Sequence, residues 1–360
     1  MHSIIDLRSD TLTIPTKDML SSMREGSLGD DGYGEDCSTN SLQTFCADYF
    51  CKEAALFMSS GTMSNQVAIR CWTQPGDEII LDNTYHINYF EAGATVDLGK
   101  VYLNLCHTKD GIIREHDLLA AIENKHRSSL SSYPTLLCLE NTINTLSGKI
   151  YPLDDMRNIY ACAKENNLNV HLDGARLLNA CASLNIHASE YSHYADSLTI
   201  CFSKGLGAPF GSMLMGTKEF IEKAKKYRKW YGGGLHQSGP MASAALFAMQ
   251  NNISRLKKDH EKALELARFL QFCPGIKINM QLVETNIVMI DISETKMHST
   301  DFTDALRKET GVILYSWNPH MVRAVTSMNV SHSDVLTAGK QIQKFLYNRF
   351  RQFSKRCLHG

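Results

Sequence analysis

The chain has 360 residues, which is long enough for one large domain and a smaller one around a sizeable core. Its 37 Lys and Arg residues nearly balance its 38 Asp and Glu residues, so the formal net charge is −1. The sequence has no run of basic residues interleaved with aromatic ones. This pattern argues against a nucleic-acid or anionic-membrane partner.

The N-terminal segment 1–16 carries Asp6, Arg8 and Asp10, so it lacks the layout of a signal peptide. No apolar stretch approaches the roughly 20 residues that a membrane-spanning helix needs. Several of the eleven cysteines, such as Cys138 and Cys201, lie inside apolar runs, which favours reduced core thiols over a disulfide framework. We therefore expect no membrane association and a cytoplasmic location.

Short apolar runs alternate with longer helical or polar stretches in the first two thirds of the chain. This alternation is typical of βα units and predicts an α/β fold with a mostly parallel, seven-stranded sheet in a large domain. The seven candidate strands are 54–58, 78–81, 101–105, 136–139, 170–172, 198–202 and 212–215.

After residue 239 the pattern changes to a long helical stretch at 241–272 and then to alternating segments at 276–280, 286–292, 312–315 and 321–326. An amphipathic helix over about 333–350 follows. We predict an N-terminal arm and large domain over 1–245, and a small C-terminal α+β domain over 246–360.

Two of the strands are followed by residues that suit pyridoxal phosphate (PLP). Asp173 ends one predicted strand, and Lys204 lies in a glycine-flanked loop after another. A carboxylate can keep the ring nitrogen of PLP protonated, and a lysine amine can hold its aldehyde covalently. Taken alone, Asp173 could be an ordinary helix cap and Lys204 a solvated side chain.

The segment 57–65 runs from a predicted strand through small residues into a helix that begins near Met63. Exposed N–H groups at a helix start, together with the Ser60 and Thr62 hydroxyls, would form a cradle for a phosphate dianion. An ordinary N-cap would use the same residue types.

Six motifs occur in one order along nearly the whole chain: Asp-Leu-Arg-Ser-Asp-Thr at 6–11, Gly-Asp-Asp-Gly-Tyr-Gly-Glu-Asp at 29–36, Leu-Glu-Asn-Thr at 139–142, Asp-Gly-Ala-Arg at 173–176, Ser-Lys-Gly at 203–205 and Gly-Gly-Gly at 232–234. In these motifs the chain closely resembles the low-specificity L-threonine aldolase family. The resemblance implies a PLP enzyme with the aspartate-aminotransferase fold, which is fold type I.

The resemblance also implies roles for individual residues. Lys204 would hold PLP, Asp173 would face the pyridine nitrogen, and His86 would stack on the ring. The cofactor phosphate would be bound by Ser60, Gly61 and Thr62. The α-carboxylate of an amino-acid substrate would be bound by Ser9, Arg176 and Arg323, with Arg176 also next to the cofactor.

In this family the cofactor sites lie at a dimer interface, so the resemblance implies a homodimer or a homotetramer. Tyr33, Arg228 and Lys229 match the residues that the neighbouring subunit contributes to the phosphate. The alternative for Arg228 and Lys229 is an ordinary solvated helix end.

Two positions depart from the family pattern. Ile143 stands where the family usually has a histidine facing the substrate β-hydroxyl, and His236 stands where it commonly has an arginine. Isoleucine cannot accept a proton, so this catalytic role would pass to His86, to a water held by the cofactor phosphate or to His236. Loss of a general base costs roughly 10²–10⁴-fold in rate where nothing replaces it.

The leading hypothesis is therefore a lyase of amino-acid metabolism that converts a β-hydroxy-α-amino acid into glycine and an aldehyde. A second hypothesis, motivated by Ile143, is an alanine racemase of the same family, because an apolar side chain suits a substrate methyl group. A third is a non-catalytic relative. We expect no metal site, since the histidines and cysteines lack metal-binding spacings.

Overall fold

The computed structural model describes residues 4–124, 126–128 and 130–357, with side chains through Arg349. The chain divides into two compact units. The larger unit comprises 14–146 and 150–254, and the smaller one comprises the residues up to Thr13, 147–149 and the residues from Arg255 onward.

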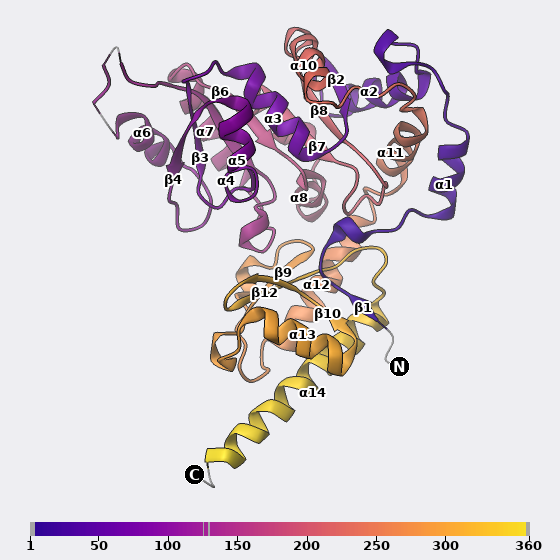
Figure 1. The fold of residues 1–360 in the computed structure, drawn as a ribbon, viewed down its shortest axis with the longest axis vertical. Helices are drawn as coiled ribbons and strands as arrows, with labels where there is room; N and C mark the ends of the chain where they lie inside the picture. Colours follow the sequence, from indigo (N-terminus) through magenta and orange to yellow (C-terminus); the bar gives the residue numbers. More distant parts are fainter. Residues whose placement is uncertain (1–3, 125, 129, 358–360) are drawn as a thin grey trace. The chain divides into compact units, whose positions relative to one another are not determined.

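A seven-stranded sheet forms the centre of the larger unit (Figure 1). Its strand order is β2-β8-β7-β6-β5-β3-β4; β8 is antiparallel to both neighbours, and the other pairs are parallel. The predicted fold class is confirmed, and each predicted strand overlaps one of these seven. Their bounds are β2 Ala54–Met58, β3 Glu78–Asp82, β4 Tyr102–Cys106, β5 Pro134–Glu140, β6 Asn169–Asp173, β7 Ser197–Cys201 and β8 Ser212–Gly216.

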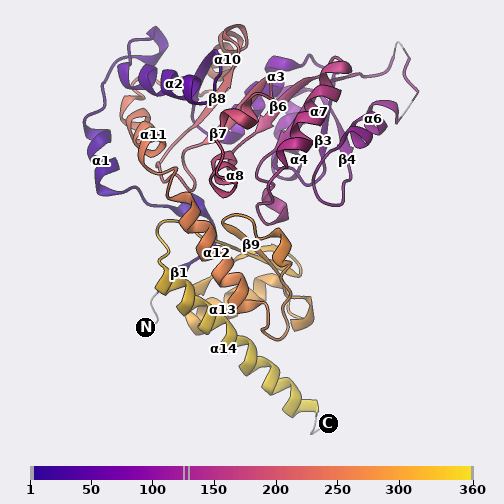
Figure 2. The same ribbon diagram turned by 180° about the vertical axis from the view of Figure 1, so that it is seen from behind.

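Helices cover both faces of this sheet. The α3 helix lies in front of the strands in Figure 1, whereas α7 and α8 lie in front in the reverse view of Figure 2. All residues of β3, β7 and β8 are buried, as expected for strands with helices on both sides. The helices of this unit are α1 Lys17–Arg24, α2 Cys37–Tyr49, α3 Gly61–Trp72, α4 His86–Tyr89, α5 Ala92–Ala94, α6 Glu115–Glu123, α7 Leu153–Glu165, α8 Leu177–Leu184, α9 Ser189–Ser192, α10 Lys218–Trp230 and α11 Gly239–Asn251.

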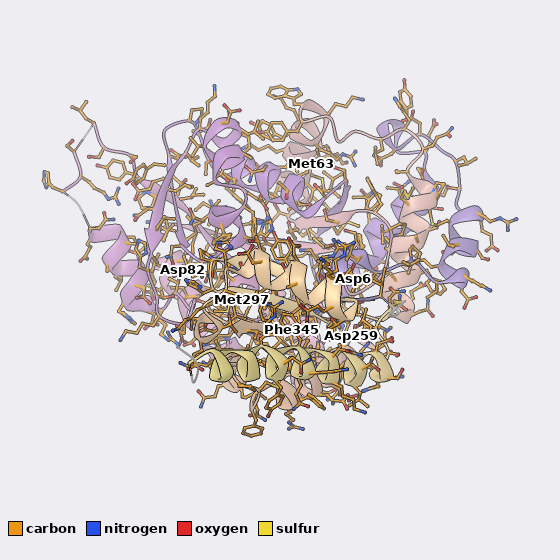
Figure 3. The ribbon with its side chains drawn as sticks, turned by 60° about the horizontal axis from the view of Figure 1, so that its bottom comes forward. Asp6, Met63, Asp82, Asp259, Met297 and Phe345 are labelled. Atoms are coloured by element: carbon orange, nitrogen blue, oxygen red, sulfur yellow. The ribbon has the colours of Figure 1, made fainter. Side chains whose placement is uncertain are left out.

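The smaller unit contains a three-stranded antiparallel sheet in the order β11-β12-β9 and a two-stranded parallel pair, β1 and β10. Its helices share one apolar core, in which Phe345 packs edge-on against Phe302 at 5.4 Å between ring centroids (Figure 3). The elements are β1 Ile5–Asp6, α12 Leu256–Leu270, β9 Ile287–Asp291, α13 Ser299–Thr310, β10 Val312–Ile313, β11 Tyr315–Asn318, β12 Met321–Val325 and α14 His332–Cys357.

The structure differs from the prediction in where the units divide. The predicted boundary at 245 falls inside α11, whereas the contacts divide the chain between Ser254 and Arg255. The N-terminal residues also belong to the smaller unit, because Ile5 and Asp6 pair in register with Val312 and Ile313.

Two predicted elements also differ. The helical stretch 241–272 is two helices, since Asn252 ends α11 and its side-chain amide donates to the carbonyl of Leu206 at 2.7 Å. Segment 276–280 is not a strand; it forms one isolated bridge, between Lys277 and Asp291. Within the described part of the chain, no helix is both long and apolar enough to span a membrane.

Candidate active site

A cavity of about 200 Å³ lies in the larger unit, where β5, β6 and β7 reach their carboxyl ends. Ligands of open α/β sheets are usually found at this edge. The cavity is lined by Ser60, Gly61, Thr62, Asn65, His86, Glu91, Glu140, Thr142, Asn144, Asp173, Ala175, Arg176, Cys201, Ser203 and Lys204. Seven of the residues singled out from the sequence are in this set.

Asp173 is the last residue of β6, and its carboxylate is held in one orientation. Oδ2 accepts a hydrogen bond from Asn65 Nδ2 at 2.8 Å, and Oδ1 accepts one from the backbone N–H of Ala175 at 3.1 Å. The residue is only 3% exposed. The fold therefore presents a fixed, buried carboxylate to the cavity.

Lys204 follows β7 in a tight loop. Its backbone carbonyl accepts a hydrogen bond from Gly207 N at 2.9 Å, and Gly207 has a φ of 80°, which favours glycine. Since β6 and β7 are parallel neighbours, their carboxyl ends bring Lys204 and Asp173 to the same cavity. A lysine and a carboxylate can thus act on one bound group.

The start of α3 forms another side of the cavity. Ser60 is the N-cap, and its side chain accepts a hydrogen bond from Met63 N at 3.1 Å. A Cβ added at Gly61 would lie 2.6 Å from the sulfur of Cys201, so only glycine leaves this approach open. Backbone N–H groups at a helix start bind anions such as phosphate.

His86 and two buried carboxylates form a compact cluster in the cavity. His86 Nδ1 lies 2.7 Å from Glu91 Oε1, and one ligand atom each of His86, Glu91 and Asp173 lies within 4.8 Å of the others. Burial alone would lower the pKa of His86. The hydrogen bond to Glu91 and the negative charge of Asp173 outweigh burial and raise that pKa above its usual value.

Glu140, the last residue of β5, also lines the cavity, although sequence reasoning assigned it no role. Its carboxylate accepts hydrogen bonds from the backbone N–H groups of His86 and of Asn144, the latter at 2.8 Å. Burial and the nearby charge of Asp173 raise the pKa of Glu140 to about 7. The cavity therefore contains a carboxyl group that can hold a proton near neutral pH.

Arg176 and Ile143 have different positions relative to the cavity. Arg176 is buried, lines the cavity and donates to Asn144 Oδ1 at 3.4 Å. Ile143 is 0% exposed and is not among the lining residues. Its Cδ1 would lie 2.9 Å from a Cβ placed on Gly111, so the side chain packs toward that loop. The structure does not bring Ile143 to the site where the sequence argument put it.

Ser9 and Arg323 belong to the smaller unit. Ser9 Oγ accepts a hydrogen bond from Thr11 N at 3.2 Å. Arg323, on β12, lies over the rings of Tyr315 and Trp317, at 5.1 and 4.9 Å from their centroids. Its Nη2 donates to the carbonyl of Arg8, next to Ser9, at 3.2 Å. Ser9 and Arg323, the two predicted carboxylate ligands, are thus close to each other. The sequence analysis did not identify Tyr315 and Trp317, the aromatic residues that contact Arg323.

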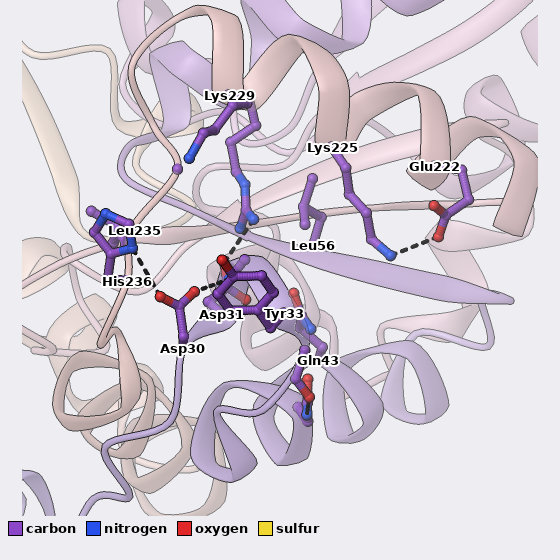
Figure 4. Close-up of a pocket in the computed structure, with 15 residues that line it drawn as sticks. Asp30, Asp31, Tyr33, Gln43, Leu56, Glu222, Lys225, Lys229, Leu235 and His236 are labelled. Atoms are coloured by element: carbon purple, nitrogen blue, oxygen red, sulfur yellow. Dashed lines mark hydrogen bonds and ion pairs between the residues drawn. The ribbon is translucent and has the colours of Figure 1, made fainter.

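Tyr33, Arg228 and Lys229 line a second cavity of the larger unit, of about 690 Å³ (Figure 4). Arg228 Nη2 is 2.7 Å from Asp31 Oδ2, and the two side chains form a buried ion pair. Tyr33, in contrast, is 83% exposed. His236 Nδ1 lies 2.9 Å from Asp30 Oδ2 at the edge of this cavity. None of these residues lines the cavity that contains Lys204.

Comparisons with known proteins place the chain in a family. A model of the β-eliminating lyase family matches residues 6–295. Low-specificity L-threonine aldolase 1 of Arabidopsis thaliana is 36% identical over 334 residues, which cover 92% of this chain and 93% of that protein. The low specificity L-threonine aldolase of Escherichia coli K12 is 35% identical over 344 residues, or 95% and 99% of the two chains.

The chain belongs to the low-specificity L-threonine aldolase family. Solved structures of aldolases have the same fold as this family member. A threonine aldolase of Leishmania major superposes with a TM-score of 0.81 at 20% sequence identity, over 95% of this chain and 99% of that one. A putative L-allo-threonine aldolase of Listeria monocytogenes gives 0.76 over 91% and 93%. The predicted family resemblance and the lyase class are confirmed.

Proposed function

We propose that the protein uses PLP to cleave a β-hydroxy-α-amino acid of the L-threonine or L-allo-threonine type into glycine and an aldehyde. The observation that carries this proposal is one cavity lined by Lys204, Asp173 and the start of α3, in a chain of the threonine aldolase family.

The residues of the cavity fit PLP at each of its polar groups. The N–H groups and hydroxyls at 60–62 would bind the phosphate, and Gly61 leaves the room that a phosphate needs. Asp173 would pair with the ring nitrogen, and Lys204 would hold the aldehyde carbon. When bound there, PLP supplies an electron sink for the charge that develops at the substrate α-carbon.

Arg176 would bind the substrate α-carboxylate from within the cavity. A guanidinium that holds a carboxylate through two hydrogen bonds fixes its orientation as well as its charge. That orientation decides which bond to the α-carbon lies perpendicular to the cofactor ring and can break. We propose Ser9 and Arg323, the paired residues of the smaller unit, as further carboxylate ligands.

We assign acceptance of the β-hydroxyl proton to His86. Because Nδ1 is bonded to Glu91, Nε2 remains for the substrate, and it has no hydrogen-bond partner among the described residues. General-base catalysis requires the acceptor within hydrogen-bond reach of the proton. Glu140, whose carboxylate accepts from the His86 backbone N–H, would fix the start of α4 and with it the position of the imidazole.

The racemase alternative loses the observation that motivated it. It depended on an isoleucine facing the substrate side chain, and Ile143 does not line the cavity. The relatives described above are aldolases by name. Aldol cleavage is therefore the function that we propose.

We propose a homodimer or homotetramer in which Tyr33 and Lys229 of one subunit complete the phosphate site of another. Their grouping in a cavity apart from Lys204 supports this arrangement. Cytoplasmic location is likewise a proposal, supported by the absence of disulfides among the cysteines whose side chains are described.

The test is aldehyde formation from L-allo-threonine and L-threonine by the purified protein with added PLP. We expect glycine and acetaldehyde in equal amounts from the natural sequence, and none from Lys204→Ala. Lys308→Ala, an exposed substitution on α13 of the smaller unit, is the folding control. Equal aldehyde formation by Lys204→Ala would contradict the assignment of Lys204, and no turnover by the natural sequence would contradict the proposed function.

A further inference from the structure

A row of polar side chains, buried except for the half-buried Trp72, leads through the larger unit to Asp173. It starts at Trp72 on α3, whose Nε1 donates to Ser197 Oγ on β7 at 2.8 Å. Ser197 Oγ lies 2.9 Å from His171 Nδ1 on β6, and His171 Nε2 lies 3.1 Å from Asn65 Oδ1 on α3. Asn65 Nδ2 then donates to Asp173 Oδ2 at 2.8 Å. Sequence reasoning gave no role to the four residues that precede Asp173.

The first end of the row allows one direction for all of its hydrogen bonds. An indole N–H can only donate, so Ser197 Oγ accepts from Trp72. The Ser197 hydroxyl proton is then available for donation to His171 Nδ1. If Nδ1 accepts this proton, the single proton of a neutral His171 is on Nε2.

The other end requires the same direction. A carboxylate only accepts, so the amide group of Asn65 must turn its NH₂ toward Asp173. The amide oxygen of Asn65 therefore faces His171 Nε2, which must donate. Asp173 thus requires the Nε2–H tautomer of His171, and the Trp72 end of the row accommodates the same tautomer.

Burial supports a neutral imidazole at this position. His171 is 0% exposed, Ser197 is 0% exposed and Asn65 is 1% exposed. Desolvation lowers the pKa of His171 to about 4, even though the charge of Asp173 acts in the opposite direction. A protonated His171 could not accept the Ser197 hydroxyl proton, so the neutral form is the one that the row can use.

We propose that these four side chains are positioning residues that hold the Asp173 carboxylate in the orientation needed by the cofactor ring nitrogen. The inference rests on the proposed function, because only a bound pyridine ring gives that orientation a purpose. Each hydrogen bond in the row points toward Asp173, and aligned hydrogen bonds polarise one another in a low-dielectric interior. The members, in order, are Trp72, Ser197, His171 and Asn65.

The Asn65 side-chain amide also connects the row to Glu91 and His86. Asn65 Nδ2 also lies 3.3 Å from Glu91 Oε1, which is bonded to His86 Nδ1. Rotation of the Asn65 amide would therefore turn its oxygen toward both Asp173 and Glu91. His171 prevents this rotation because its Nε2–H holds the amide oxygen on the other side.

The tautomer is measured directly by long-range ¹H–¹⁵N correlation spectra of protein labelled with ¹⁵N-histidine, before and after PLP is added. The His171 signals are those missing from the spectrum of His171→Leu. We expect a neutral Nε2–H imidazole from pH 7.5 to about pH 5, because its pKa is about 4. An Nδ1–H tautomer, or a charged ring at pH 7, would overturn the proposed direction of the row.

The link to the cofactor is measured by PLP affinity, from quenching of tryptophan fluorescence. We expect His171→Leu to bind PLP about 10- to 100-fold more weakly, because an Asn65 amide that can rotate loses its hydrogen bond to the charged Asp173, and such a loss has about this effect. The control is His260→Leu, since His260 is also buried with a pKa lowered to about 4, but lies in the smaller unit. A merely structural role would lower thermal stability in both variants and leave PLP affinity equal.

Ser197→Ala provides a second variant if His171→Leu does not fold. It removes both the acceptor for Trp72 and the donor to His171 Nδ1, and we expect a loss of PLP affinity while Asn65 keeps His171 in the Nε2–H tautomer. Unchanged affinity in Ser197→Ala would overturn the proposal. Failure of the natural protein to bind PLP would instead refute the proposed function, while the tautomer spectra would still report on the row itself.

Discussion

At the scale of residues, segment 142–144 shows how neighbouring side chains divide between two environments. Thr142 and Asn144 line the cavity, whereas Ile143 between them is fully buried toward Gly111. The isoleucine at this position fills an apolar gap and does not line the cavity.

This arrangement predicts the effect of Ile143→His. We expect no gain in kcat/KM for L-allo-threonine, because the new imidazole would point away from the cavity. Burying it without a partner should cost about 1–3 kcal/mol in the free energy of unfolding, measured with urea. Ile143→Val, which should cost about 1 kcal/mol, is the matched control. A tenfold rise in kcat/KM would show that position 143 reaches the substrate.

The sequence identified the residues whose position follows from strand ends. Asp173 and Lys204 share a cavity because each follows a strand of the parallel part of the sheet. Asn65, Glu91 and Glu140 were not assigned roles, because their partners come from other elements. Asn65 and Asp173, for example, are 108 positions apart in sequence.

At the scale of elements, the start of α3 depends on one close approach. A Cβ on Gly61 would meet the sulfur of Cys201, at the end of β7. Within the described part of the chain, no other atom outside the two neighbouring residues and the α3 backbone lies within 4 Å of it. The spacing between α3 and β7 therefore determines how near a phosphate can come to the helix N-terminus.

Gly61→Ala should consequently weaken PLP binding by at least about tenfold, since small displacements in a preorganised site have large effects. The double variant Gly61→Ala with Cys201→Ala should recover part of that affinity, because the clashing sulfur is removed. Cys201→Ala alone is the control. Equal affinities for Gly61→Ala and the double variant would mean that the cause is not this contact.

Helix α12 carries the buried His260. Burial lowers the pKa of His260 to about 4, below the ~6.5 of an exposed histidine. Between these values the unfolded chain binds a proton that the folded chain does not, so stability falls as the pH falls.

Protonation linked to His260 should make the free energy of unfolding about 2 kcal/mol lower at pH 5 than at pH 8. His260→Gln removes the titrating group. Between pH 8 and pH 5, its free energy of unfolding should therefore fall by about 2 kcal/mol less than that of the natural protein. The measurement is urea unfolding of both proteins at the two pH values. Parallel pH dependence of the two would contradict a depressed pKa at His260.

At the scale of the whole molecule, composition and periodicity predicted two units and the seven strands of the main sheet. They did not predict that the N-terminal residues join the smaller unit, because that depends on the pairing of β1 with β10, about 300 positions later. The break between α11 and α12 was missed for a similar reason, since Asn252 is held by the carbonyl of the distant Leu206.

The proposed exchange of residues between subunits predicts complementation. Lys204→Ala and Lys229→Ala should each be inactive alone, the first for lack of the PLP lysine and the second for lack of a phosphate ligand. Mixed and re-equilibrated in equal amounts, they should recover about a quarter of the natural activity, because half of the dimers are mixed and each has one complete site. No recovery, with subunit exchange verified by labelling, would argue that Lys229 does not act across an interface.

Cleavage of a β-hydroxy-α-amino acid with Lys204 and PLP can be observed by proton NMR in D₂O. The PLP-loaded protein is incubated in parallel with L-allo-threonine, L-threonine and L-alanine. We predict glycine and acetaldehyde signals from at least one threonine isomer, and none with Lys204→Ala. Loss of the alanine α-proton with formation of D-alanine, and no glycine from either threonine, would contradict the account and establish a racemase.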